Sequence, residues 1–253
     1  MSRIHTKLRE DKKLVSVYFT AGFPNLNDTV PTIQTLEKSG VDMIEIGLPF
    51  SDPLADGPTI QESSTIALEN GMTTKLLFEQ LQNIRETVTI PLIIMGYFNP
   101  ILQFGVVEFC QKCAQVGIDG LIIPDLPIAT FEEEYKAIFE RYHLKNIFLI
   151  TPQTSEERIR KIDTISDSFI YMVSSSSTTG SQQCFGTIQQ NYFERIAGMG
   201  LNNPQITGFG ISNSVTFQQA VQHQKGAIIG SAFIKFMKNN SIESIPKFIE
   251  SIV

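Results

Sequence analysis

The feature that most constrains the fold of this chain is an eightfold alternation of short apolar runs with amphipathic segments. Runs rich in Val, Ile and aromatic residues recur along the sequence, and each is followed by a turn and a segment with helical spacing of apolar residues. The predicted strands cover residues 14–22, 43–50, 91–98, 120–126, 146–151, 169–174, 205–210 and 226–234. The predicted helices between them cover residues 29–39, 59–69, 74–86, 106–116, 131–142, 156–165, 188–197 and 214–222.

This alternation predicts a parallel sheet, because consecutive parallel strands need a crossover connection between them. Strands that helices cover on both faces are nearly continuous in apolar residues, as these runs are. Eight such units in 253 residues favour a closed (β/α)8 barrel over an open doubly wound sheet. No linker-like stretch divides the chain, so we expect residues 1–253 to form a single (β/α)8 TIM barrel domain of the α/β class.

Charge and composition exclude several classes of function. The formal net charge is −6 and no long basic run is present, which argues against nucleic-acid binding and against a polybasic membrane patch. No apolar stretch approaches the roughly 20 residues that cross a bilayer, and the N-terminus lacks the apolar core of a signal peptide. Three cysteines, an odd and low number, indicate a reducing compartment, so we expect a cytoplasmic protein.

The sequence predicts neither a metal site nor a cofactor. Cys110 and Cys113 have the spacing of half a zinc site, but they lie in a segment with helical periodicity and no second pair of ligands follows. The three histidines are not spaced with acidic residues as metal ligands would be, and no serine–histidine arrangement indicates acyl transfer. Dinucleotide and Walker fingerprints are also missing from the sequence.

Two carboxyl groups near the end of the second predicted strand are candidate catalytic groups. Side chains alternate between the faces of a strand, so Glu45 points into the barrel if the flanking isoleucines pack outward. Burial without a cationic partner raises the pKa of a carboxyl group toward neutrality, which suits a general acid or base. The alternative is a core glutamate satisfied by a backbone amide or a lysine. In the proline-rich loop that follows, Asp56 either turns over the barrel mouth beside Glu45 or caps a helix that begins near Pro58.

Glycines after the last strands predict a phosphate site. In (β/α)8 barrels, backbone amides after the seventh and eighth strands and a helix N-terminus bind phosphate groups. The candidates here are Gly210, Gly230 with Ser231, and Gly180 after the sixth strand, although ordinary turns also use such glycines. The small polar stretch 174–183 is interpreted as a lid over the substrate rather than an idle surface loop.

Aromatic residues are predicted around the same mouth. They are Tyr18, Tyr97, Tyr171 and Phe209. Aromatic walls favour a flat apolar group on the substrate, whereas the alternative is that these rings belong to the ordinary core of the barrel.

A specific family resemblance is carried by residues 44–61, which read IEIGLPFSDPLADGPTIQ. This segment resembles the signature of the tryptophan synthase alpha subunit, and further matches follow in family order at 97–101, 120–127, 208–212 and 230–232. The resemblance covers essentially the whole chain. It implies a (β/α)8 barrel that cleaves indole-3-glycerol phosphate by a retro-aldol reaction into indole and glyceraldehyde 3-phosphate. It also implies docking on a beta subunit, in an alpha2-beta2 complex, where indole and serine become tryptophan.

The resemblance also implies roles for individual residues. Glu45 matches the acid/base that protonates C3 of the indole and takes the proton of the glycerol hydroxyl, and Asp56 matches the aspartate that interacts with the indole N–H. Asp52 and Pro53 fall in the loop that touches the beta subunit. The matching phosphate ligands are Gly180, Gly210, Gly230 and Ser231, and the matching indole-pocket residues are Tyr18, Tyr97, Tyr171 and Phe209.

The predicted lid departs from the family pattern. Many members carry Arg-x-Gly-x-Thr-Gly there, whereas this chain has Ser175 and Ser177 at the Arg and first Gly positions and keeps Thr179 with Gly180. Without that arginine we expect poor lid closure and a slow isolated chain. A lesser departure is Phe23, where an acid or tyrosine is common.

Other functional interpretations stay open beside a lyase that works inside the complex. They are a stand-alone indole-releasing lyase, a non-enzymatic partner that only activates a beta subunit, and, from the barrel pattern alone, another sugar-phosphate lyase. Retention of both Glu45 and Asp56 argues against the non-enzymatic partner.

Overall fold

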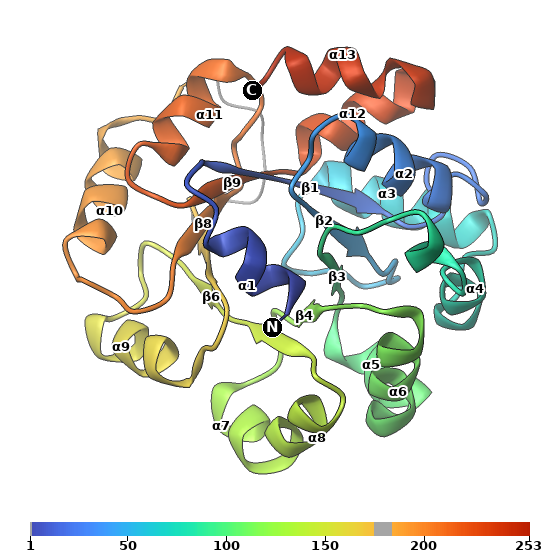
Figure 1. Cartoon of the computed structure of the whole chain (residues 1–253), viewed down its shortest axis with the longest axis horizontal. Coiled ribbons are helices and arrows are strands. Elements are labelled where there is room, and N and C mark those ends of the chain that lie inside the picture. Colours follow the sequence, from blue (N-terminus) through green and yellow to red (C-terminus); the bar gives the residue numbers. More distant parts are fainter. Residues whose placement is uncertain (1, 175–183) are drawn as a thin grey trace.

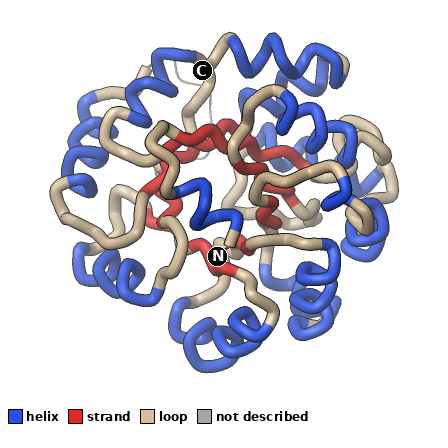
Figure 2. The backbone as a smooth tube through the Cα atoms, in the orientation of Figure 1, coloured by secondary structure: helices blue, strands red, loops and turns tan. Residues whose placement is uncertain are grey.

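The strands of the chain form one parallel sheet that lies at the centre of the molecule (Figures 1 and 2). The structure is a computed structural model and describes residues 2–174 and 184–253. The strands are β1 (Leu14–Thr20), β2 (Met43–Gly47), β3 (Leu92–Met95), β4 (Gly120–Ile122), β5 (Lys145–Ile147), β6 (Leu149–Ile150), β7 (Ile170–Val173), β8 (Gln205–Gly208) and β9 (Gly226–Ile229). Their order in the sheet is β5-β4-β3-β2-β1-β9-β8-β7-β6.

The two ends of that order are consecutive pieces of one extended segment. β5 pairs with β4 and β6 pairs with β7, and only Phe148 separates β5 from β6 along the chain. The sheet therefore closes on itself, which removes the exposed strand edges of an open sheet. The predicted (β/α)8 barrel is confirmed, with the fifth predicted strand, 146–151, interrupted at a single residue.

Helices surround the barrel on its outside, apart from the first, which lies across one end (Figures 1 and 2). They are α1 (Arg3–Leu8), α2 (Thr29–Lys38), α3 (Pro58–Glu69), α4 (Thr74–Gln80), α5 (Phe98–Phe104), α6 (Val106–Val116), α7 (Ile128–Thr130), α8 (Lys136–Arg141), α9 (Glu156–Ile165), α10 (Thr187–Ala197), α11 (Ser214–Val221), α12 (Ser231–Asn239) and α13 (Ile245–Glu250). Among the described residues, no helix has the length and apolarity to cross a membrane.

The predicted helix over 106–116 is confirmed as α6, and its apolar stripe explains the pair of cysteines. Cys110 and Cys113 are both buried, together with Phe109 on the same face. Burial raises the pKa of the Cys110 thiol to about 12, so this side chain stays protonated and acts as a small apolar core residue.

Several predicted elements are longer than the observed ones. The strand predicted over 43–50 ends at Gly47, because Pro49 has no N–H to donate to a sheet. The helix predicted over 74–86 ends at Gln80 and is followed by a separate 3₁₀ turn at Ile84–Glu86. The segment predicted as one helix over 131–142 consists of two parts, a π-helical turn at Phe131–Tyr135 and then α8.

The amino end of the barrel is closed by α1, which lies across the strands in Figure 1. Its Ile4 is fully buried. A β-carbon on Gly120 of β4 would lie only 3.3 Å from Ile4 Cδ1, so α1 packs closely against this strand. Side-chain carboxylates hold the loops at this end. Asp119 accepts hydrogen bonds from the Leu92 amide (3.0 Å) and from Arg85 Nη2 (2.6 Å), and it also pairs with Arg3 Nη1 at 3.0 Å.

A second carboxylate at the amino end has a similar set of partners. Asp42 is buried and accepts a hydrogen bond from the Val15 amide at 3.0 Å. Its Oδ1 lies 3.2 Å from Lys7 Nζ and 2.5 Å from Lys12 Nζ. Each carboxylate thus joins the start of one strand to cations from other segments, which ties the amino end together.

Candidate active site

Glu45 lies inside the barrel, as the alternation of residues in β2 predicts. Its side chain is fully buried, and its carboxyl Oε1 accepts a hydrogen bond from Ser16 Oγ of β1 at 3.0 Å. The other oxygen, Oε2, has no hydrogen-bond partner among the described residues. Burial raises the pKa of Glu45 to about 8, and the Ser16 hydrogen bond opposes this shift only in part. The hydrogen-bond donor to Glu45 is therefore a hydroxyl group, and not the lysine or backbone amide of the alternative interpretation.

Asp56 lies at the barrel mouth and does not cap the following helix. α3 begins at Pro58, as expected, but its N-cap residue is Gly57 and no side chain caps it. Asp56 Oδ2 instead accepts a hydrogen bond from Tyr97 Oη at 3.2 Å, and Tyr97 Oη accepts one from the Ala55 amide at 2.9 Å. Burial raises the pKa of Asp56 to about 6, while the Tyr97 hydrogen bond acts in the opposite direction.

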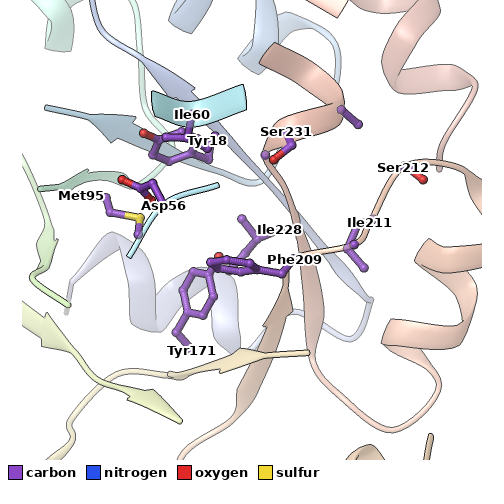
Figure 3. Close-up of a pocket in the computed structure, with 13 residues that line it drawn as sticks. Tyr18, Asp56, Ile60, Met95, Tyr171, Phe209, Ile211, Ser212, Ile228 and Ser231 are labelled. Atoms are coloured by element: carbon purple, nitrogen blue, oxygen red, sulfur yellow. The ribbon is translucent and has the colours of Figure 1, made fainter. Parts of the chain in front are cut away.

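A pocket opens at the carboxyl ends of the strands and is walled by aromatic and aliphatic side chains (Figure 3). Tyr18, Ile60 and Met95 lie beside Asp56, and Tyr171, Phe209 and Ile228 lie across from them. The rings of Tyr171 and Phe209 meet edge to face, with centroids 6.3 Å apart. Three of the four predicted mouth aromatics therefore line this pocket, whereas Tyr97 lines an adjoining hollow with Asp56 and Tyr18.

Two glycines make room for the tyrosines of the pocket. A β-carbon on Gly47 would lie 2.2 Å from the hydroxyl oxygen of Tyr18, and one on Gly208 would lie 2.1 Å from that of Tyr171. Each tyrosine hydroxyl therefore occupies the space that a side chain on the neighbouring strand would fill. Burial, and to a lesser extent the nearby acids, raises the pKa of both tyrosines, so their hydroxyls stay protonated and can donate hydrogen bonds.

The predicted phosphate residues that the structure describes lie on one side of the pocket. Gly210, Gly230 and Ser231 all line it, and Figure 3 shows Ser231 at the start of α12 facing the opening. The first turn of a helix has backbone N–H groups without acceptors inside the helix, so α12 presents donors there. Gly210 has φ of +79°, a left-handed conformation that favours glycine.

Part of the predicted lid lies outside the described residues. Ser175, Ser177, Thr179 and Gly180 all belong to 175–183, so their roles stay predictions. Ser174, the first residue of the predicted lid stretch, is buried rather than part of a loose loop. Its Oγ donates a hydrogen bond to the Phe209 carbonyl oxygen at 2.7 Å, which joins the end of β7 to the end of β8.

The two residues predicted to touch a beta subunit differ in their exposure to solvent. Asp52 is exposed, but Pro53 is buried and lines the hollow beside Asp56. Leu54 stands out instead, with 89% of its surface exposed.

Ser16 and Met95 are site residues that the sequence analysis missed. Ser16 lies two residues before Tyr18 on β1, so both side chains face the barrel interior, and that spacing is the signal that could have identified it. Met95 pairs in register with Gly47, which places it at the mouth, but nothing about a lone methionine in an apolar strand indicates a pocket.

Comparison with known proteins gives a consistent result over the full length of the chain. The family model described as tryptophan synthase alpha chain matches residues 4–251. The tryptophan synthase alpha chain of Flavobacterium psychrophilum is 71% identical over 252 residues, covering 100% of both chains. That of Flavobacterium johnsoniae is 68% identical, again covering 100% of both chains.

Solved structures agree with these sequence matches. Tryptophan synthase subunit alpha from Legionella pneumophila superposes with a TM-score of 0.89 at 30% identity, covering 100% of this chain and 97% of that one. A chain in the aminoacrylate-bound form of tryptophan synthase from M. tuberculosis superposes with a TM-score of 0.85 at 26% identity, covering 98% and 97%.

Proposed function

The chain belongs to the tryptophan synthase alpha chain family and cleaves indole-3-glycerol phosphate in tryptophan biosynthesis, and we propose that Glu45 and Asp56 are its catalytic residues. The observation that carries this proposal is a pair of carboxyl groups whose surroundings raise their pKa values by different amounts. The pKa of Glu45 is raised to about 8 and that of Asp56 to about 6. Near pH 7 Glu45 holds a proton and Asp56 is mostly ionised, so one site contains an acid and an anion together.

The order of proton transfers follows from these states. Protonated Glu45 donates to C3 of the indole ring, while the Asp56 carboxylate accepts a hydrogen bond from the ring N–H, which becomes more acidic as positive charge develops. The Glu45 carboxylate then takes the proton of the glycerol hydroxyl, and the carbon–carbon bond breaks to release indole and glyceraldehyde 3-phosphate. Glu45 Oε2 has no hydrogen-bond partner among the described residues, and Glu45 acts electrostatically on Tyr18 and Tyr171 of the pocket wall, so this oxygen is the one we assign to the proton transfers.

The rest of the pocket supports the binding of the two ends of the substrate. Tyr18, Tyr171 and Phe209 offer flat apolar surface to the indole ring, and Tyr97 orients Asp56 beside it. The N-terminus of α12 at Gly230 and Ser231, with Gly210, offers backbone donors to the phosphate. Gly180 completes this set by family position and lies outside the described residues.

The pH dependence of indole release tests the pair of catalytic residues. We expect kcat/KM to follow a bell-shaped profile with its maximum between about pH 6 and pH 8, because Asp56 must be ionised and Glu45 protonated. In Asp56→Asn the acidic limb should disappear and the rate should fall by roughly 10²-fold. A profile that keeps its acidic limb in this variant contradicts the role of Asp56.

We also propose that the chain works in the cytoplasm, as one barrel domain of residues 1–253, with a tryptophan synthase beta subunit in an alpha2-beta2 complex. The exposed Asp52 and Leu54 at the mouth support docking there, and the three free cysteines fit a reducing compartment. Sedimentation with and without the beta subunit, together with indole release, tests the association. A complex that forms and raises the rate is expected, whereas no complex favours a stand-alone lyase.

A further inference from the structure

The end of β7 contacts the turn that follows β8, beside the phosphate end of the pocket. The Ser174 amide donates to the Gly208 carbonyl oxygen at 3.1 Å, and Ser174 Oγ donates to the Phe209 carbonyl oxygen at 2.7 Å. We propose that Ser174 is a positioning residue that holds the backbone amide of Gly210 toward the phosphate group of the substrate. This inference rests on the proposed role of Gly210 as a phosphate ligand.

The turn after β8 has an uncommon backbone conformation. Phe209 has φ of +70° and Gly210 has φ of +79°, so two consecutive residues are left-handed. Glycine adopts this conformation readily, whereas for phenylalanine it has a steric cost. A residue of that kind keeps the conformation only where its surroundings hold it there. The hydrogen bond from Ser174 to the Phe209 carbonyl oxygen is one interaction that does so.

The same hydrogen bond fixes the direction of an N–H group. The Phe209 carbonyl and the Gly210 amide belong to one peptide unit, which is planar and trans, so its C=O and N–H bonds point in opposite directions. Because Ser174 holds the carbonyl oxygen on one side, the N–H of Gly210 points to the other side. Gly210 lines the pocket together with Gly230 and Ser231, so we assign this N–H to the phosphate group that these residues bind.

Ser174 is itself held firmly in place. It is 1% exposed and directly follows β7, which is buried along its whole length. Phe185 packs on the same turn, because a β-carbon on Gly210 would lie 3.0 Å from Phe185 Cε1 and 3.7 Å from Ser174 Oγ. The Phe185 ring in turn meets Phe193 edge to face, with centroids 5.3 Å apart. A hydroxyl group with such fixed surroundings can orient the peptide unit that it contacts.

The helix after the turn uses its first donors internally. Asn213 Oδ1 accepts a hydrogen bond from the Thr216 amide at 2.9 Å, and Thr216 Oγ1 accepts one from the Ser212 amide at 3.0 Å. These contacts cap the start of α11. They favour the turn at Gly210, rather than the N-terminus of α11, as the source of a donor for the phosphate.

Removal of the Ser174 hydroxyl group tests this role. Ser174→Ala keeps the β-carbon and deletes the hydrogen bond to Phe209, so we expect KM for indole-3-glycerol phosphate to rise about fivefold and kcat to change less than about twofold. The dissociation constant of glycerol 3-phosphate, read from the Gly210 amide signal of ¹⁵N-labelled protein, should rise by a similar factor. Ser174→Cys has nearly the same shape but a weak donor, so it should behave like Ser174→Ala.

Ser168→Ala is the matched control. Ser168 precedes β7 at its amino end, is 2% exposed, and its Oγ accepts a hydrogen bond from the Phe169 amide at 2.5 Å. Its replacement should lower the free energy of unfolding in urea titrations but leave both KM and glycerol 3-phosphate binding unchanged. The two variants together separate a loss of phosphate binding from a general loosening around β7.

The possible outcomes distinguish this inference from the proposal on which it rests. If Ser174→Ala binds glycerol 3-phosphate as the unaltered protein does, Ser174 has no positioning role, while Gly210 remains a phosphate ligand. The role of Ser174 is also overturned by a fall in kcat at unchanged KM, or by an equal rise of KM in Ser168→Ala. If glycerol 3-phosphate does not shift the Gly210 signal of the unaltered protein, both proposals are wrong. If Ser174→Ala does not fold, Ser174→Cys decides.

Discussion

The two ends of the barrel surround their carboxyl groups with different partners. At the amino end, Asp42 and Asp119 each contact two cationic side chains and accept a backbone N–H hydrogen bond. At the mouth, Glu45 and Asp56 accept hydrogen bonds from hydroxyl groups, and neither makes an ion pair within the described residues. The same chemical group therefore has two different electrostatic environments in this barrel.

The carboxyl groups at the two ends of the barrel therefore have different roles. A carboxylate that is paired with cations and accepts a backbone N–H hydrogen bond joins segments of the chain, so it contributes to stability. A carboxyl group that is buried without a cation has its pKa raised toward neutrality and can exchange a proton near pH 7. Stability at the amino end and chemistry at the carboxyl end is the division that (β/α)8 enzymes share.

The largest effect is expected for Glu45→Gln. Glutamine keeps the shape of the side chain but cannot transfer a proton, so indole release should fall by about 10² to 10⁴-fold while the fold is retained. Steady-state kinetics and circular dichroism on the same preparation measure both properties. Turnover close to that of the unaltered protein would remove Glu45 from the mechanism.

The same variant should change how stability depends on pH. Burial raises the pKa of Glu45 from 4.5 to about 8, so between these values the folded protein holds a proton that the unfolded chain releases. This contribution to the free energy of unfolding is complete below about pH 4.5 and is lost as the pH rises through 8. Glu45→Gln lacks that loss, so its stability relative to the unaltered protein should increase by a few kcal/mol from pH 5 to pH 8.5. A constant difference across this range contradicts the raised pKa.

The next largest effect is expected at the amino end. Asp119→Asn leaves Arg85 with a neutral partner in a mostly buried position, so the free energy of unfolding should fall by about 3 kcal/mol in urea titrations. Indole release per folded molecule should stay unchanged. Glu79→Gln is the matched control, because the exposed Lys75–Glu79 pair at 3.9 Å contributes less than about 1 kcal/mol. Equal losses in the two variants would contradict a special role of the amino-end pairs.

The smallest effect is expected at the phosphate end of the pocket. Gly210→Val places a side chain where the backbone approaches the anion and strains a left-handed residue, so KM should rise about tenfold and kcat should change less. Glycerol 3-phosphate should raise the melting temperature of the unaltered protein and not that of the variant. Gly71→Val controls for backbone strain, since Gly71 has φ of +94° and open space around it. A normal thermal shift in Gly210→Val would place the phosphate elsewhere.

Local sequence patterns predicted most of the elements. The helices over 106–116 and 156–165 have the predicted bounds, because their apolar residues repeat at helical spacing over the full segment. The strand predicted over 226–234 is only Gly226–Ile229, because the apolar residues that follow belong to α12. A continuous apolar run has no period that separates a buried strand from a buried helix, so its boundary could not be predicted.

The sequence by itself determined the eight strand–helix units, the inward position of Glu45 and the helix start at Pro58, because each depends on residues adjacent in the chain. The tertiary structure alone decided that Asp56 meets Tyr97, 41 residues away, instead of capping α3. It also decided that the hydrogen-bond donor to Glu45 is a serine and that the carboxylates of the amino end are paired with cations. These environments arise only when distant strands are brought side by side, and burial and partners, not residue type, set the chemistry of a carboxyl group.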